Sequence, residues 1–278
     1  MQTAHFSYRQ QGSRPKRSLG QNFLRDDNIA RKIVLSVSPR PDDTVVEIGP
    51  GEGALTQYLA PAVRRLILVE LDDRAAEALR LQYAGERVTV LHADILATDL
   101  SAMAREAGRA LRVVGNIPYN ITSPILFHLL EHRAAVEDAT IMMQKEVAQR
   151  LVASPRTKEY GILSVFFQLF TEPRLLFDVQ PTAFYPRPSV VSSLVHLRIL
   201  PVPRYPLLDE TLFRAMVRSV FGTRRKMLRH SLREFLARRG RALPEALRLQ
   251  QRPEELTVEE LVRLGNDLGA AEGGGETA

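Results

Sequence analysis

Three glycines and an acidic residue follow one another at a spacing typical of nucleotide binding. Gly49, Gly51 and Gly53 come directly after a short apolar run, and Glu70 follows Gly51 by 19 residues. Glycines in such a turn let the backbone pass close under a ligand, which side chains would obstruct. A carboxylate about twenty residues further on, at the end of the next strand, can accept hydrogen bonds from both hydroxyls of a ribose. The pattern predicts a site for a cofactor that contains a nucleoside.

The spacing and charge of this loop indicate which nucleoside cofactor it suits. The dinucleotide fingerprint is G-x-G-x-x-G, whereas this loop reads G-x-G-x-G, with Glu47 just before it and Glu52 inside it. Acidic groups there would repel a pyrophosphate but tolerate a cationic or zwitterionic ligand. S-adenosylmethionine has a sulfonium, an amino group and no phosphate. We also expect Asp94, at the end of the third predicted strand, to accept a hydrogen bond from an adenine amino group.

A second motif, Asn116-Ile117-Pro118-Tyr119, ends the fourth predicted strand. The exocyclic amine of adenine is a poor nucleophile because its lone pair is delocalised into the ring. The side-chain oxygen of Asn116 and the carbonyl of Ile117 can each accept one N–H of that amine and hold its lone pair toward a methyl donor. Pro118 stiffens the turn, and Tyr119 offers a flat, electron-rich face for stacking. The motif predicts methyl transfer to a planar amine, with Asn116, Pro118 and Tyr119 as catalytic residues.

A target base must leave its helical stack to reach such a site, so a second aromatic residue on the opposite side would complete a clamp. Phe184, in a proline-rich loop near Pro186 and Pro188, is the candidate for that catalytic role. Aromatic residues in such loops often simply pack, so the alternative is that Phe184 is a core residue.

The elements that must position these residues form an α/β pattern. Short β-branched runs alternate with helical periods between residues 42 and 200. The predicted strands are residues 44–48, 66–70, 87–92, 111–115, 140–144, 174–179 and 190–199. Two of the predicted helices are residues 73–83, with Asp72 or Asp73 as cap, and residues 124–132, with Ser123 as cap. A doubly wound sheet follows, with its functional loops at the carboxyl ends of the strands and an antiparallel pair at the edge.

The positive charge of the chain is confined to two segments. The net charge is +6, but residues 1–25 carry +5 and residues 213–241 carry +9, and the rest of the chain is slightly acidic. Basic segments on a near-neutral body are typical of a protein that binds a polyanion such as RNA. In the second segment we expect phosphate contacts from Arg224, Arg225, Lys226 and Arg229. The alternative for these side chains is a solvated helix face.

Prolines at positions 201, 203 and 206 predict a linker, after which the pattern is helical. The predicted helices are residues 208–220, 224–238, 244–249 and 258–268, the last introduced by a capping box of Thr257 and Glu260. The sequence therefore predicts four regions. They are a basic N-terminal segment (1–25), a methyltransferase domain (26–200), a small all-α RNA-binding domain (201–269) and a disordered tail (270–278).

Composition excludes several classes of protein. The chain has no cysteine, which excludes a disulfide framework, a thiolate metal site and a cysteine nucleophile, and we expect no metal. Its longest apolar run, residues 161–170, is about half of the roughly 20 residues that a membrane-spanning helix needs. The first residues lack the apolar region of a signal peptide. We therefore expect a cytoplasmic protein with no membrane partner.

Taken together, these motifs resemble those of the ribosomal RNA adenine N6,N6-dimethyltransferases, specifically the small-subunit (KsgA-type) enzymes. The similarity covers nearly the whole chain and rests on residues 19–24 (LGQNFL), 46–51 (VEIGPG), 116–120 (NIPYN), 144–150 (QKEVAQR), 221–226 (FGTRRK) and the Phe184 segment. It implies the Rossmann-like sheet of class I methyltransferases, with helices on both faces. It further implies that Asn22 and the backbone of Leu24 close over S-adenosylmethionine. The further contacts would come from Gly49, Gly51, Glu70, Asp94 and Asn116.

The reaction implied by the resemblance is methylation of N6 on two adjacent adenosines in a 3′-terminal hairpin loop of small-subunit RNA. The partner would be that RNA or a pre-30S particle, and the enzyme would act as a monomer with a role in small-subunit biogenesis. One departure is Ile117, where these enzymes usually have Leu, and Ile is commoner in the large-subunit enzymes that confer macrolide resistance. Residues 122–125 and 224–226 favour the small-subunit type.

Two alternatives belong to other classes. A non-catalytic assembly factor on the same fold would be expected to have a damaged cofactor loop or target motif, and here both are intact. A nicotinamide dehydrogenase is disfavoured by the spacing of the glycines.

Overall fold

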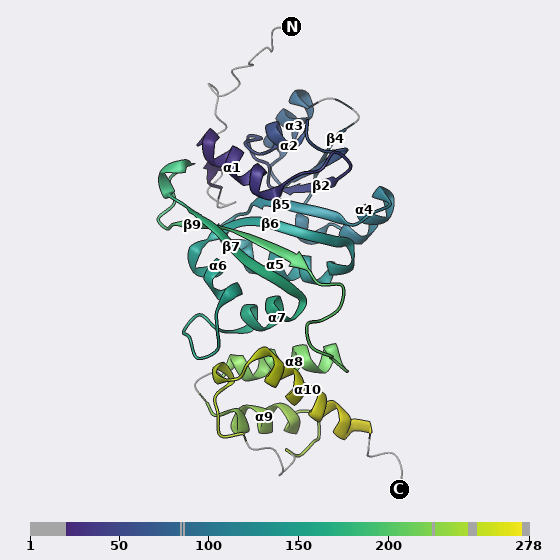
Figure 1. Cartoon of the computed structure of the whole chain (residues 1–278), viewed down its shortest axis with the longest axis vertical. Coiled ribbons are helices and arrows are strands. Elements are labelled where there is room, and N and C mark those ends of the chain that lie inside the picture. Colours follow the sequence, from purple (N-terminus) through teal and green to yellow (C-terminus); the bar gives the residue numbers. More distant parts are fainter. Residues whose placement is uncertain (1–20, 84, 86, 224–225, 244–248, 274–278) are drawn as a thin grey trace. The chain divides into compact units, whose positions relative to one another are not determined.

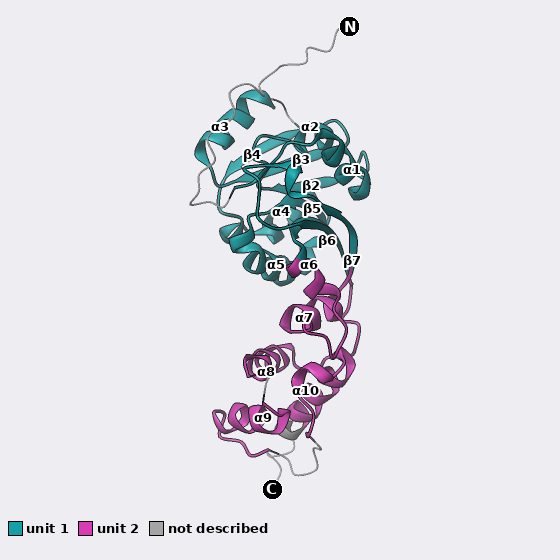
Figure 2. Ribbon diagram, turned by 90° about the vertical axis from the view of Figure 1, so that its left-hand side faces the viewer, with its two compact units in different colours: residues 1–145, 174–199 teal, residues 146–173, 200–278 magenta. Residues whose placement is uncertain are grey.

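The protein divides into two compact units, each of which is described by itself. The computed structural model describes residues 21–83, 85, 87–223, 226–243 and 249–273. The first unit contains residues 1–145 and 174–199, and the second contains residues 146–173 and 200–278 (Figure 2). One division between the units falls between residues 199 and 200, next to the three prolines from which the sequence predicted a linker. Residues 146–173, in contrast, belong to the helical unit and not to the α/β unit in which the sequence pattern had placed them.

A seven-stranded sheet forms the centre of the first unit (Figure 1). Its strand order is β4 (Val88–His92), β3 (Arg65–Glu70), β2 (Thr44–Ile48), β5 (Leu111–Asn116), β6 (Val136–Gln144), β9 (Ser192–Ile199) and β7 (Thr171–Val179). From β4 to β6 all neighbouring strands are parallel, and β9 is antiparallel to β6. All seven predicted strands are present, and the last two predicted ones lie side by side at the edge.

The central strands are buried along their length, as expected for parallel strands covered on both faces. Every residue of β2 is buried, whereas β7 at the edge exposes three consecutive residues. The helices of this unit are α1 (Asp27–Val37), α2 (Thr56–Leu59), α3 (Asp73–Gln82), α4 (Leu100–Ala107) and α5 (Thr122–Glu131).

Two of these helices test the predicted caps. Asp72 caps α3 by accepting a hydrogen bond from the Arg74 N–H, as expected. Helix α5 begins at Thr122, so Ser123 lies inside its first turn and is not the cap. The reason is that a 3-10 turn, Tyr119–Ile121, leads directly into this helix.

The order of the strands marks where a ligand binds. Within the sheet, β3 lies on one side of β2 and β5 lies on its other side. The chain first passes from β2 to β3 and later enters β5, so the connections diverge between β2 and β5. In doubly wound sheets, ligands bind in the crevice outside the carboxyl ends of the strands at such a point. Gly49 follows β2 and Asn116 ends β5 at that edge.

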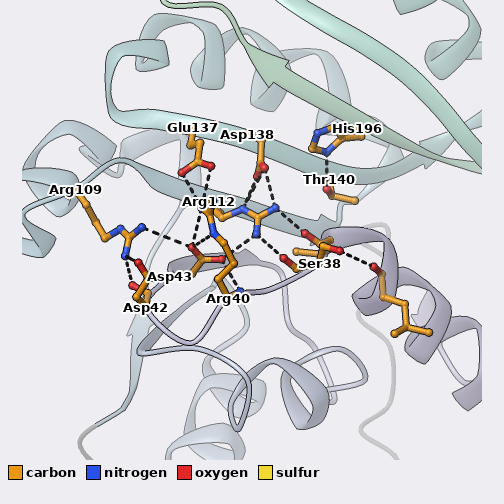
Figure 3. Close-up of polar contacts among 12 residues, drawn as sticks. Ser38, Arg40, Asp42, Asp43, Arg109, Arg112, Glu137, Asp138, Thr140 and His196 are labelled. Atoms are coloured by element: carbon orange, nitrogen blue, oxygen red, sulfur yellow. Dashed lines mark hydrogen bonds and ion pairs between the residues drawn. The ribbon is translucent and has the colours of Figure 1, made fainter.

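The opposite, amino edge of the same strands holds a buried ion network around Arg112 (Figure 3). Arg112 lies in β5 and pairs at 2.8 Å with both Asp43, before β2, and Asp138, in β6. Its remaining N–H groups donate to the carbonyl oxygens of Ser38 and Val37. All five guanidinium N–H groups are therefore used.

The second unit is helical. It contains α6 (Lys145–Val152, from its second residue), α7 (Ile162–Phe170), α8 (Glu210–Gly222), α9 (Leu228–Ala237) and α10 (Val258–Gly273). Edge-to-face ring pairs, Tyr160 with Phe221 and Phe166 with Phe213, lie in its core. No helix among the described residues is long and apolar enough to cross a membrane.

Three of the four predicted helices of this unit, residues 208–220, 224–238 and 258–268, are confirmed with shifted ends as α8, α9 and α10. Helix α9 begins at Leu228 instead of residue 224, and the predicted helix 244–249 falls almost wholly outside the described residues. The capping box is present, since the Thr257 N–H donates to Glu260 and the Glu260 N–H donates to the Thr257 hydroxyl. Helix α10 continues to Gly273, so the first residues of the predicted disordered tail are helical.

Candidate active site

The glycine loop after β2 has a backbone that side chains would not permit. Gly49, Gly51 and Gly53 all have positive φ, at 63°, 56° and 77°. A Cβ atom on Gly51 would also lie 2.9 Å from the ring of Phe23. The Phe23 ring thus packs directly on the loop, and only glycine fits beneath it. The sequence pattern gave roles to its neighbours Asn22 and Leu24 but not to Phe23 itself.

Glu70 at the end of β3 is tied to this loop. Its two carboxylate oxygens accept hydrogen bonds from the backbone N–H groups of Gly51 and Asp72, both at 2.9 Å. Burial raises the pKa of Glu70, and these two N–H groups oppose that shift. Each oxygen has a second lone pair, so the carboxylate can still accept hydrogen bonds from a diol.

The loop is less negative than the sequence suggested. Burial raises the pKa of Glu47 to about 8, with a hydrogen bond from the Thr56 hydroxyl opposing the shift and Glu70 adding to it. Glu47 is therefore largely protonated near neutral pH. Glu52 forms an ion pair with Arg25 at 2.9 Å. The loop therefore has less negative charge with which to repel a phosphate, and a cationic ligand would favour the ionised form of the buried Glu47.

The target motif is held by two hydrogen bonds. The Asn116 side-chain N–H donates to the backbone carbonyl of Asn22 at 2.9 Å. Because that carbonyl can only accept, it fixes the orientation of the amide and leaves the Asn116 side-chain oxygen as an acceptor. The Tyr119 hydroxyl is 2.6 Å from the Ser192 hydroxyl, and burial raises the pKa of Tyr119. Tyr119 is therefore a neutral ring held at a fixed position.

Gly115 brings the two motifs together. A Cβ atom on this residue of β5 would lie only 2.8 Å from the carbonyl oxygen of Ile48, the last residue of β2. The close approach of the two strand ends places the Gly49 loop beside Asn116, whose carbonyl oxygen would be 3.8 Å from a Cβ on Gly49. A glycine in an otherwise β-branched strand is the signal from which this residue could have been found.

These elements enclose one pocket at the carboxyl edge of the sheet. It is lined by residues 21–24, 47–52, 54–55, 69–71, 93–95, 116–121 and 125. Nine predicted site residues lie in it, namely Asn22, Leu24, Gly49, Gly51, Glu70, Asp94, Asn116, Pro118 and Tyr119. Asp94 is exposed, and its side chain caps a 3-10 turn by accepting from the Leu96 N–H.

The predicted base clamp is not formed. Phe184 is 95% buried, packs in the core with Leu24 and does not line the pocket. Its backbone pairs with that of Leu24, which holds the ring inward. In this structure Phe184 is a core aromatic residue, which was the alternative to its predicted role in the clamp.

The four predicted phosphate contacts are only partly described. Arg224 and Arg225 lie outside the described residues. Lys226 and Arg229 are exposed, but the Lys226 ammonium pairs with Glu234 at 3.0 Å, so part of its charge is compensated.

A doubly wound sheet with a glycine loop after one central strand and an Asn-x-Pro-Tyr motif after the next defines a class I methyltransferase that acts on an amine. The comparisons with known proteins place the chain more narrowly. The model of the ribosomal RNA adenine dimethylase family matches residues 12–267, and the chain belongs to this family.

Individual relatives agree with that placement. The chain is 48% identical over 249 residues to the ribosomal RNA small subunit methyltransferase A of Chlorobium chlorochromatii, which covers 90% of this chain and 92% of the relative. Among solved structures, a dimethyladenosine transferase from Plasmodium falciparum has the same fold, with a TM-score of 0.73, 23% identity and coverage of 90% and 98% of the two chains. The 23S rRNA methyltransferase ErmE is 30% identical, with a TM-score of 0.62 and coverage of 87% and 100%.

Proposed function

We propose that this enzyme transfers methyl groups from S-adenosylmethionine to N6 of two adjacent adenosines in a 3′-terminal hairpin loop of small-subunit ribosomal RNA. The observation that carries the proposal is the fixed Asn116 amide in the pocket lining, whose oxygen remains available to an incoming amine. The 48% identity to a small-subunit methyltransferase supports the choice of RNA. The enzyme would act as a monomer in the cytoplasm, on the RNA or on a pre-30S particle.

The pocket fits the proposed cofactor in four respects. The glycine loop leaves room for a ligand close to its backbone, and Glu70 offers acceptors for two ribose hydroxyls. Asp94 lines the pocket, and we propose that it accepts a hydrogen bond from the adenine amino group. Glu47, buried beside the loop without a cation among its hydrogen-bond partners, suits a ligand that brings positive charge. When bound, S-adenosylmethionine supplies an electrophilic methyl group.

The protein's part in the chemistry is to orient the amine. The Asn116 oxygen and the Ile117 carbonyl each accept one N–H, which turns the nitrogen lone pair toward the cofactor side of the pocket. Pro118 has no N–H to compete for those acceptors. The Tyr119 ring, held by Ser192, stacks on the base and faces the positive charge that moves to nitrogen. No strong general base is needed, because the methylated amine is cationic and loses its proton to water or a carbonyl.

The decisive test compares the two ribosomal RNAs as substrates. The purified enzyme and isolated small and large subunits lacking dimethyladenosine are incubated with labelled S-adenosylmethionine, and nucleosides are analysed by mass spectrometry. We expect dimethyladenosine in the small-subunit RNA alone. Asn116→Ala is expected to lose at least about a hundredfold in rate while it still binds the cofactor. Methylation of the large-subunit RNA would overturn the proposal in favour of the resistance-type activity, and full activity of Asn116→Ala would overturn the mechanism.

A further inference from the structure

An aromatic residue that the proposed chemistry does not use pairs with a residue of the pocket lining. Strand β1 (Phe23–Leu24) pairs antiparallel with β8 (Phe184–Tyr185), so that Phe23 lies opposite Tyr185 and Leu24 opposite Phe184. Paired residues of two antiparallel strands share a face, and successive residues alternate between faces. Phe184 is therefore buried, whereas Tyr185 is 57% exposed. Among the aromatic side chains that the structure describes, Tyr185 alone is exposed.

Tyr185 is linked to the cofactor loop through two contacts. It shares a face of the ribbon with Phe23, whose ring packs on Gly51. The Arg25 guanidinium lies over the Tyr185 ring, 5.7 Å from its centre, and also pairs with Glu52, which lines the pocket. Tyr185 thus lies at the edge of the pocket and not on a remote surface.

The segment that follows adds positive charge to this rim. Residues 185–187 are all exposed, and no side-chain partner of Arg187 is found among the described residues. Arg25 is compensated by Glu52, so Arg187 is the cation that this rim offers to an anionic ligand. The β1–β8 ribbon therefore ends in a flat aromatic face followed two residues later by a cation.

A flat aromatic ring beside a cation is how proteins bind an unpaired nucleotide. Bases of single strands stack on aromatic side chains, and arginine contacts the neighbouring phosphate. When an RNA loop delivers one base into the pocket, the neighbouring nucleotide lies at the edge of the pocket. The base of that neighbouring nucleotide must leave its own stack. We propose that Tyr185 and Arg187 bind the nucleotide next to the target adenosine, its base on the Tyr185 ring and its phosphate at Arg187. This inference rests on the proposed function, because it needs a target base in the pocket.

The experiment measures stacking at the neighbouring position without catalysis. The full chain with S-adenosylhomocysteine is titrated into an RNA hairpin that contains a single 2-aminopurine, either at the target adenosine or at the nucleotide beside it. Stacking on an aromatic ring quenches this base. We expect quenching at the neighbouring position with the parent and with Tyr185→Phe, which keeps the ring. With Tyr185→Ala this quenching is expected to be lost, and the RNA Kd is expected to rise about tenfold.

Two matched variants separate the ring from its surroundings. Val190→Ala changes an exposed residue of the same segment and is expected to leave both signals as in the parent. Arg187→Gln is expected to lower RNA affinity and to reduce the slope of log affinity against log salt by about one, as for the loss of one phosphate contact. The thermal unfolding midpoint of each variant reports whether the fold is intact.

The outcomes distinguish this inference from the proposed function. Quenching beside the target that persists in Tyr185→Ala overturns the assignment of Tyr185. Equal loss of signal at the target and at its neighbour also overturns it, because Tyr185 would then act on the pocket as a whole. Absence of quenching at both positions in the parent contradicts the proposed function itself and removes the basis of the inference.

Discussion

The two edges of the sheet bury charged groups in opposite ways. At the amino edge, Asp43 and Asp138 are buried against Arg112, and every N–H of that guanidinium has an acceptor. At the carboxyl edge, Glu47 and Glu70 are buried with N–H and O–H donors, and within the described part of the chain no cation is among their hydrogen-bond partners. The same strands, β2 and β5, contribute to both edges. A satisfied edge stabilises the fold, and an edge with uncompensated acids is prepared for a ligand.

The pKa values of the two edges follow from this difference. Burial alone would raise the pKa of Asp43, but hydrogen bonds from Arg112 and Arg40 outweigh it and hold that pKa below its usual value. At Glu47 burial dominates, and the pKa is raised to about 8. Asp43 therefore stabilises the fold when ionised, and this contribution is lost as the pH falls through its lowered pKa. Glu47 contributes fully below about pH 4.5, its ordinary pKa, and its contribution is lost as the pH rises toward 8.

The largest effect should come from removing the centre of the amino edge. Arg112→Met removes the donor of the buried Asp138 carboxylate and of two carbonyl oxygens, and it leaves Asp43 with Arg40 alone of the two arginines that donate to it. We expect a loss of about 3–5 kcal/mol in the free energy of unfolding. Urea denaturation measures it. Arg65→Met is the matched control, since Arg65 begins β3 at the same edge but pairs with the exposed Glu106. A loss of about 1 kcal/mol or less is expected there. Equal losses in both variants would show that the Arg112 network is not the stabilising feature.

Replacing Glu47 should change how stability depends on pH. Gln cannot ionise, so Glu47→Gln should remove a fall of up to about 1.4 kcal/mol per pH unit between roughly pH 5 and pH 8. The measurement is the difference between the unfolding free energies of parent and variant at pH 5, 6, 7 and 8. Glu52→Gln, in the same loop but paired with Arg25, is the control and should show no such trend. A constant difference for Glu47→Gln would mean that its carboxyl is ionised throughout this range.

Glu70→Gln should act on the ligand more than on the fold. The two oxygens of Glu70 accept from the N–H groups of Gly51 and Asp72. The glutamine amide has only one acceptor oxygen, so its NH₂ group would face one of these N–H donors and that hydrogen bond would be lost. We expect cofactor affinity to fall about tenfold, measured by calorimetry with S-adenosylhomocysteine. Arg112→Met, in whatever fraction remains folded, should keep near-parental affinity. Unchanged affinity in Glu70→Gln would remove Glu70 from the proposed cofactor contacts.

The site residues of the carboxyl edge could be predicted from the sequence because they stand in short local motifs. Glycine spacing, an acid 19 residues after Gly51 and the Asn116 motif each depend on local sequence. Of these residues, Gly49, Gly51, Glu70 and those of the Asn116 motif line the pocket. The contacts of Phe23 with Gly51, and of Asn116 with Asn22, join residues far apart in the chain and leave no local signal. Phe184 was proposed as the second aromatic residue of a base clamp, but pairing with Leu24 turns its ring into the core, which was the alternative.

The amino edge gave a signal that was not used. A charged residue such as Arg112 within a run of buried apolar residues requires a buried partner, and Asp138 lies in the neighbouring strand. Which acid it meets is decided by strand order, since Asp43 and Asp138 lie on either side of β5. Propensity and periodicity within one segment do not contain that information.

The smallest effect should come from the exposed part of the same network. Arg40 donates to Asp43 and to Glu137, but about half of its side chain is exposed. Asp43 keeps Arg112 when Arg40 is removed, so no buried carboxylate loses all its partners. We expect Arg40→Ala to cost about 1 kcal/mol or less, and the cost to shrink further in 1 M NaCl because solvent and salt screen exposed pairs. Urea denaturation at low and high salt measures this. A salt-independent loss as large as that of Arg112→Met would mean that stability at this edge depends on the number of ion pairs and not on burial.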